Sequence, residues 1–205
     1  MSLMPHHSKQ QRRGLLFGVG SLLAVSWMAG SLVSHRTHME MDDTVKLEGW
    51  RIEFKTPVGW SEGSPQMDLR GGTVFAFSPV SDEYGSGSVI LRVHRAMTTD
   101  KLTAREYCDD IIGQLTAIAG EPSPGNIRHS DSQMGDWPAC FADVHEPTDL
   151  YYGMPGLNLR VLSAVHVEDH VTYAYAIEMQ SAGPFRNRQE IAWDKIVKSV
   201  KTVGG

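Results

Sequence analysis

Charge is absent from one stretch of this sequence, and acidic residues are absent from a longer one. Residues 14–34 contain no Lys, Arg, Asp or Glu, and the first 34 residues contain no Asp or Glu. The net charge of −5 is therefore uneven, because the first 34 residues carry +3 and the remainder carries −8. An acidic remainder argues against a protein that coats nucleic acid, and a hydrophobic content of 41% excludes a multi-span membrane protein.

Cysteine and aromatic residues are also scarce. The chain has 2 cysteines and 8% aromatic residues among its 205 residues. The cysteines do not form a C-x-x-C pair, which excludes a thioredoxin-like motif, and neither comes directly after the uncharged stretch, which excludes a lipidated N-terminus of the bacterial type. The length predicts one folded domain with an appendage.

The uncharged stretch is long enough to cross a membrane. As an α-helix, residues 14–34 would extend about 31 Å, which matches the hydrocarbon core of a bilayer. Basic residues precede the stretch and acidic residues follow it, which predicts a cytoplasmic N-terminus and an extracytoplasmic remainder: Lys9, Arg12 and Arg13 lie before it, and Glu40, Asp42 and Asp43 after it.

We therefore expect a single-pass membrane protein with four parts. A basic cytosolic region spans 1–13, a transmembrane helix spans 14–34, a tether spans 35–47 and an exported domain spans 48–203. Two alternatives stay open. Small residues at 24–26 and 29–31 also fit a cleaved signal peptide, which would make the domain secreted, and Arg12-Arg13 resembles a twin-arginine export signal with Gln11 in place of Ser or Thr.

Alternating apolar residues predict strands in the exported domain. Trp50, Ile52 and Phe54 alternate with charged residues, and similar runs occupy 73–78, 89–93, 127–133, 139–146, 157–167 and 171–179. The last two runs are separated by Glu168, Asp169 and His170, which predicts a hairpin.

Two segments have helical spacing instead. Thr103 and Glu106 form a capping-box pattern, and apolar residues follow it at helical intervals to Leu115. Trp193, Ile196, Val197 and Val200 recur at the same intervals near the C-terminus. The order of strands, helix, strands and helix predicts an α+β domain, a mainly antiparallel sheet covered by helices.

Several of these features resemble one fold superfamily. The pattern Trp-x-Ile-x-Phe-x-x-Pro-x-x-Trp at 50–60, a helix around Glu106, a long hairpin and a final Trp-x-x-Ile-x-x-Ser at 193–199 are similar to the fold of PsbP-like, Mog-like and DcrB-like proteins. The resemblance covers about 48–203. It implies a small non-catalytic domain that docks on other proteins.

The two cysteines are predicted to point inward. Cys108 lies on the apolar stripe of the first helix, and Cys140 shares a strand face with Ala142 and Val144. Disulfides form outside the cytoplasm, so a bridge closing about 33 residues and worth roughly 3.5 kcal/mol is one possibility, and two buried free thiols are the other.

Motifs for catalysis or metal binding are missing. The histidines show no ligand spacing of the H-E-x-x-H kind, and His145, Asp143 and His166 are the least implausible metal ligands. The segment 85–88 is neither a phosphate-binding loop nor a nucleophile elbow. No cofactor and no enzymatic activity are predicted.

Two surface features are candidates for binding. Tyr151, Tyr152 and Met154 lie in a loop rich in Pro and Gly, where exposed aromatic residues are frequent docking anchors. A second candidate is a basic patch on the sheet, although the interleaved Glu53 and Glu178 favour an ordinary solvated face; its members would be Arg51, Arg92, His94, Arg160 and His166.

The expected function is that of a membrane-anchored or secreted envelope protein with a non-catalytic domain that binds an unknown protein partner. One alternative is an extracytoplasmic enzyme with a cleft near His145 and Cys140. Another is a carrier of a small apolar ligand, which would require an apolar cavity under the helices.

Overall fold

The computed structural model describes residues 39–67, 72–80, 89–119, 126–145, 157–182 and 187–203. The segment 14–34, for which the sequence predicts a membrane helix, lies outside these ranges, as does 1–13. Within them, neither helix has the length and apolar character that a membrane crossing needs.

The described part of the chain forms eleven strands and two helices. In chain order they are β1 (Met41–Lys46), β2 (Ile52–Pro57), β3 (Trp60–Glu62), β4 (Gln66–Met67), β5 (Thr73–Pro79), β6 (Val89–Thr98), α2 (Ala104–Ala119), β7 (Ile127–Met134), β8 (Trp137–His145), β9 (Leu157–Glu168), β10 (Val171–Ala182), α3 (Asn187–Ser199) and β11 (Lys201–Thr202).

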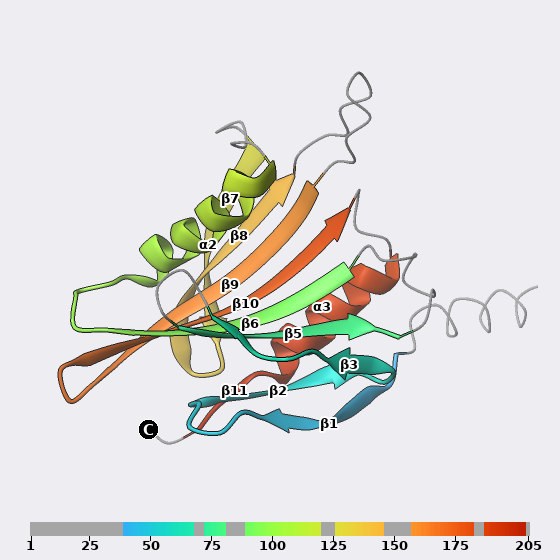
Figure 1. Cartoon of the computed structure of the whole chain (residues 1–205), viewed down its shortest axis with the longest axis horizontal. Helices are drawn as coiled ribbons and strands as arrows, with labels where there is room; N and C mark the ends of the chain where they lie inside the picture. The colour runs from blue at the N-terminus through green and yellow to red at the C-terminus, as the bar shows by residue number, and fades with distance from the viewer. Residues whose placement is uncertain are drawn as a thin grey trace, which may run out of the picture. The chain divides into compact units, whose positions relative to one another are not determined.

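Eight strands form one large antiparallel sheet (Figure 1), with the order β3-β5-β6-β10-β9-β8-β7 and β4 beside β5. The predicted hairpin is confirmed, because β9 and β10 pair along their whole lengths. Asp169 and His170 connect them with φ angles of 48° and 67°. Positive φ at both central residues is the backbone of a type I′ turn, whose twist matches that of the flanking strands.

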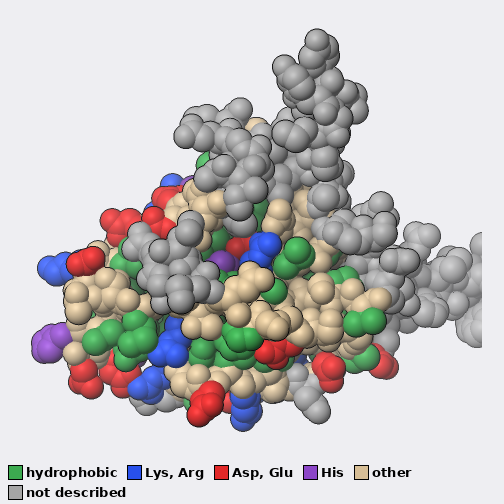
Figure 2. All heavy atoms as spheres, in the orientation of Figure 1, with side chains coloured by type: hydrophobic (Ala, Val, Ile, Leu, Met, Phe, Trp, Pro, Cys, Tyr) green, Lys and Arg blue, Asp and Glu red, His purple; other side chains and the backbone are tan. Residues whose placement is uncertain are grey.

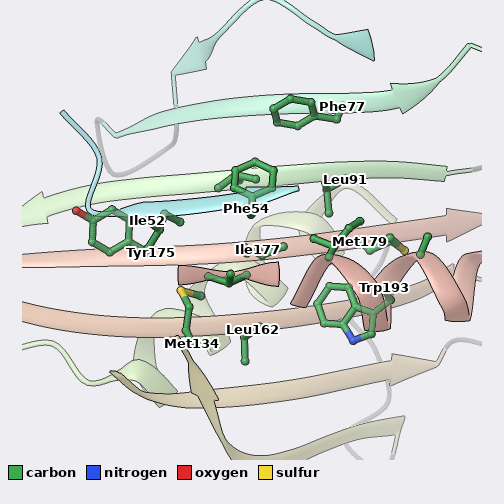
Figure 3. Packing of buried hydrophobic residues seen from close by; sticks show 14 of the residues in the cluster. Ile52, Phe54, Phe77, Leu91, Met134, Leu162, Tyr175, Ile177, Met179 and Trp193 are labelled. Carbon is green, nitrogen blue, oxygen red and sulfur yellow. The ribbon is translucent and has the colours of Figure 1, made fainter. Parts of the chain in front are cut away.

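One face of this sheet, here named the α3 face, is covered by a second layer. The layer consists of the small sheet β1-β2-β11 and helix α3. Figure 3 shows Ile52 and Phe54 of β2, with Trp193 of α3, over Ile177 and Met179 of β10. Phe54 meets Phe77 edge to face at 5.6 Å between ring centroids. This layer buries the main hydrophobic core.

The opposite face, here named the α2 face, is covered in part by α2. The predicted capping box is confirmed, because Thr103 Oγ1 accepts from the Glu106 backbone N–H at 3.2 Å and Glu106 Oε2 accepts from the Thr103 N–H at 2.8 Å. The helix then packs its apolar stripe on β8, β9 and β10, with Tyr107, Cys108 and Ile111 fully buried. A second hydrophobic cluster lies under it.

The predicted fold class is wrong. The domain is mainly β, and the expected α+β sandwich with helices covering the sheet is not formed. The error has a physical cause: the α3 face is covered largely by another sheet, and α2 spans only the strands near β8, β9 and β10. Element order along the chain did not reveal that β1, β2 and β11 leave the large sheet.

Residues 41–46 differ from the prediction as well, since they belong to β1 and not to a tether. Thr44, Val45 and Lys46 pair with β2, and a register irregularity follows Met41. The segment MDDTVK has no strict alternation of apolar residues. Its position is set by its neighbours Met39 and Leu47, whose side chains are buried in the main core.

Candidate functional site

A hollow of about 470 Å³ opens on the α2 face between the start of α2 and the strands β7 and β8. It is lined by residues 103–105, 129–131 and 138–140, and is here named the α2 pocket. The capping box fixes the first of these segments, and the regular pairing of β7 with β8 fixes the other two. The capping box and the strand pairing therefore fix the backbone of all three segments that line the pocket.

Charged groups at the pocket are joined across it. His129 Nε2 lies 2.7 Å from Asp109 Oδ1, and Arg105 Nε donates to Asp109 Oδ2 at 3.4 Å. The carboxylate of Asp109 thus links the helix to β7. Sequence reasoning missed this contact, because Asp109 and His129 lie 20 residues apart and no motif connects them.

Two thiols lie beside the pocket. Cys140 lines it and is 7% exposed, whereas Cys108 lies behind it and is fully buried. The Cys108 thiol interacts with the Cys140 thiol and with Ser163, the cross-strand neighbour of Cys140. The prediction that both cysteines point inward is confirmed. Both are thiols in this structure.

The environment does not activate either thiol as a nucleophile. Burial raises the pKa of Cys108 far above its usual value, and burial is also the main cause that raises the pKa of Cys140. The Arg105 guanidinium acts in the opposite direction on the Cys140 pKa, but Asp109 and Asp131 oppose it. A nucleophilic cysteine needs a lowered pKa, so this arrangement is unlike a cysteine-dependent active site.

The outer edge of β7 adjoins the same pocket. β7 is the last strand of the large sheet and pairs with β8 over all 8 of its residues without a bulge. Its other side has no strand partner within the described ranges. Arg128, Ser130 and Asp131 are exposed there. A regular edge of this length presents backbone N–H and C=O groups to whatever approaches it.

A buried ionic cluster lies farther along the α2 face, on β6 and β10. Glu178 is fully buried, with its Oε1 2.5 Å from Arg92 Nη1 and its Oε2 2.8 Å from His94 Nε2. Arg92 Nη1 also donates to Gln180 Oε1 at 2.9 Å. The cluster forms because Arg92 is the cross-strand neighbour of Glu178, a pairing that depends on a register the sequence does not display.

The basic patch does not form. Arg92 and His94 lie on the α2 face with Glu178, whereas Arg160 lies on the α3 face, where Glu190 and Asp143 bind it. Arg51 pairs with Glu168. His166 stacks on Trp137, with 4.7 Å between ring centroids. Figure 2 shows the same mixture, with acidic and basic side chains interspersed among the described residues of the visible face.

The three candidate metal ligands are also dispersed. Asp143 pairs with Arg160, His145 Nδ1 bonds with Asn158, and His166 lies farther along β9 against Trp137. Within the described ranges no three His, Cys, Asp or Glu side chains gather as a metal site.

The described residues do not form the cleft between His145 and Cys140 that the enzyme alternative expected. His145 and Cys140 are an odd number of residues apart on β8, so they point to opposite faces of the sheet. The space between α2 and the sheet is filled by Tyr107, Cys108 and Ile111. A separate hollow near Leu102 measures only about 180 Å³, which is small for a lipid. The loop residues Tyr151, Tyr152 and Met154 lie outside the described residues.

Comparison with known proteins gives a likeness of fold. No known family and no curated protein matches the sequence. LpqN of Mycobacterium tuberculosis, described as involved in cell envelope biogenesis, is similar with a TM-score of 0.49 and 11% identity over 82% of this chain and 92% of that chain. A structure from Bacteroides thetaiotaomicron VPI-5482 has a TM-score of 0.43 and 11% identity over 80% of this chain and 50% of that chain.

At these identities and TM-scores the two structures assign no activity, partner or location to this chain. Neither is described as PsbP-like or Mog-like, so those names are not confirmed.

Proposed function

We propose that residues 39–203 form a non-catalytic protein-binding domain that works outside the cytoplasm, either anchored by residues 14–34 or released after cleavage there. Its binding element is the outer edge of β7, and its ligand is an extended segment of a partner protein. The segment adds one strand to the large sheet and places a side chain in the α2 pocket.

The observation that carries this proposal is the regular edge of β7, which has no strand partner within the described ranges. Natural sheets usually blunt their edges with short strands, bulges or proline. The other edges of this domain do so: β3 has 3 residues, β11 has 2, and β1 has an irregular register. β7 has 8 regularly paired residues and no proline. It is the described edge best able to template another strand.

The α2 pocket supports a role for this edge in recognition. Residues 129–131 of β7 line the pocket, so a segment paired with β7 would pass its opening. Alternate side chains of an added strand point to one face of the sheet. Backbone pairing would supply affinity, and the pocket would select the side chain that fits it.

Binding is favoured over catalysis because the ionisable groups near the pocket are arranged as structural pairs. His129 and Arg105 both engage Asp109. Burial raises the pKa of the Cys140 thiol. No arrangement of a nucleophile with an activating base is present in the described part of this site.

Site-specific photo-crosslinking in intact cells tests the proposal. A crosslinking amino acid replaces Ser130 on β7, and in a matched control it replaces Ser61 on β3; both serines are exposed on edge strands at opposite ends of the large sheet. We expect one discrete protein adduct from position 130 and none from position 61. Equal adducts at both positions, or no adduct at 130 in cells that express the chain at its natural level, would contradict the proposal.

A further inference from the structure

The two thiols under α2 lie beside each other and differ in exposure, which points to a role other than partner binding. We propose that Cys108 and Cys140 are a redox site that closes to a disulfide by exchange with a small-molecule disulfide entering through the α2 pocket. The bond ties α2 to β8 beside the proposed binding edge.

The two thiols are neighbours in the core. Cys108 lies over a cross-strand pair, because Cys140 and Ser163 are directly opposite on β8 and β9 and the Cys108 thiol interacts with both. Ser163 Oγ also donates to the Ala104 carbonyl at 2.6 Å, which holds the start of α2 on this pair. The two cysteines belong to one buried cluster, so neither has to leave the core to reach the other.

The two sulfurs also differ in how easily a reagent reaches them. Cys140 is 7% exposed and lines a hollow of about 470 Å³, whereas Cys108 has 0% exposure. A disulfide reagent entering the pocket therefore meets Cys140 first. The Cys108 thiol is the more deeply buried of the two and interacts with the Cys140 thiol.

The chemistry balances with a disulfide as the oxidant. The Cys140 thiolate attacks one sulfur of the reagent, forms a mixed disulfide and releases one reagent thiol. The Cys108 thiolate then attacks the Cys140 sulfur and displaces the second reagent thiol. Two cysteine sulfurs are oxidised, one reagent disulfide is reduced to two thiols, and the two cysteine protons leave with those thiols.

The burial of both thiols makes the reaction slow at neutral pH. Exchange requires the thiolate, and burial raises the pKa of both groups. The rate should increase as the pH rises. An oxidising compartment, which the sequence predicts for this domain, would maintain the closed form once it has formed.

Oxidised glutathione added to the reduced full-length chain tests the proposal. Intact mass should show the loss of two hydrogen atoms without a retained glutathione, and a non-reducing digest should link the peptides of Cys108 and Cys140. Two cysteines that remain alkylatable after prolonged exposure, or a chain that retains two glutathiones, would overturn it.

Two single variants test the order of attack. C108S should retain one glutathione on Cys140, because no second thiol displaces it. C140S should remain unmodified while folded and become modified in denaturant. This result would show that Cys108 can react with glutathione but is inaccessible to it in the folded domain. Equal rates for the two folded variants would overturn the assigned entry through the pocket. If the serine variants do not fold, the linked peptide of the unmodified chain still decides between the two outcomes.

Discussion

Glu178 is a buried carboxylate at the centre of an ionic cluster on the α2 face. Its side chain is fully buried, and both of its oxygens are engaged, one by Arg92 and one by His94. A buried pair gains little over an apolar pair, but the loss of one partner leaves an uncompensated charge.

Glu178→Ala should therefore lower the free energy of unfolding by about 3–5 kcal/mol, as measured by urea denaturation. Glu190→Ala is the matched control, since Glu190 pairs with Arg160 but its side chain is 44% exposed. That change should cost at most about 1 kcal/mol. Similar losses for the two variants would show that Glu178 is not the stronger partner.

Because both thiols are buried in their protonated form, the free energy of unfolding depends on pH in the alkaline range. Burial raises the pKa of Cys108, Cys140 and Tyr175, so the folded state keeps protons that the unfolded state releases. Their stabilising contribution is complete below the unfolded thiol pKa of 9.0 and is lost as the pH rises above it.

In reducing buffer, the free energy of unfolding should fall between pH 9 and pH 10.5, by at most about 1.4 kcal/mol per pH unit for Cys108. Urea titrations at several pH values measure this slope. In the C108A/C140A double variant, the free energy of unfolding should stay constant until Tyr175 of the unfolded chain begins to titrate near its ordinary pKa of 10.0. A variant with the slope of the unmodified chain would exclude the thiols as its source.

At the scale of elements, Gly72, directly before β5, lies so close to the backbone of β6 that a larger residue does not fit. A Cβ on Gly72 would lie 2.1 Å from the carbonyl oxygen of Arg95, and that backbone cannot move without breaking the pairing of the two strands. Gly113 is the contrasting case: it lies in α2, and a Cβ there meets nothing within 4 Å.

Gly72→Ala should destabilise the domain by about 3 kcal/mol, while Gly113→Ala should stabilise it by about 1 kcal/mol through helix propensity. Thermal denaturation followed by circular dichroism measures both shifts. The same sign for the two variants would contradict the packing described for Gly72.

The capping box at the start of α2 is expected to contribute to the free energy of unfolding. Thr103→Ala removes the hydroxyl that accepts the Glu106 N–H, so the domain should lose about 1 kcal/mol. Because the same turn lines the α2 pocket, this change should also weaken partner capture at position 130. Urea denaturation and the crosslinking yield report these two effects separately.

Elements with a local pattern were predictable, and elements without one were not. The alternation in β2, β6, β9 and β10 and the capping box of α2 were sufficient to locate those elements. β1 and β11 are held by pairing with β2, β11 from the far end of the chain, and their own residues display no comparable pattern. The error in fold class follows from these two strands.

The same distinction applies to the candidate site. Helical and strand periodicity placed Cys108 and Cys140 inward, which the structure confirms. The link between Asp109 and His129, and the position of β7 at the edge of the described sheet, depend on how α2 and β7 are brought together in the fold. Those long-range contacts are invisible to periodicity.

At the scale of the whole molecule, one end of the large sheet concentrates the features that function needs. The outer edge of β7, the α2 pocket and the two thiols are neighbours there. At the opposite end the short β3 and β4 flank β5. The proposed function therefore uses one edge of the domain, while the α3 face supplies its stability.

Amide hydrogen exchange of the crosslinked complex against the free domain is the most direct test of this account. Strand addition predicts that the outward-facing amides of β7 become protected in the complex, while the amides of β3 and β4 exchange as before. Protection that is unchanged along β7 and increased on another element would contradict the account, because the partner would then bind without pairing with this edge.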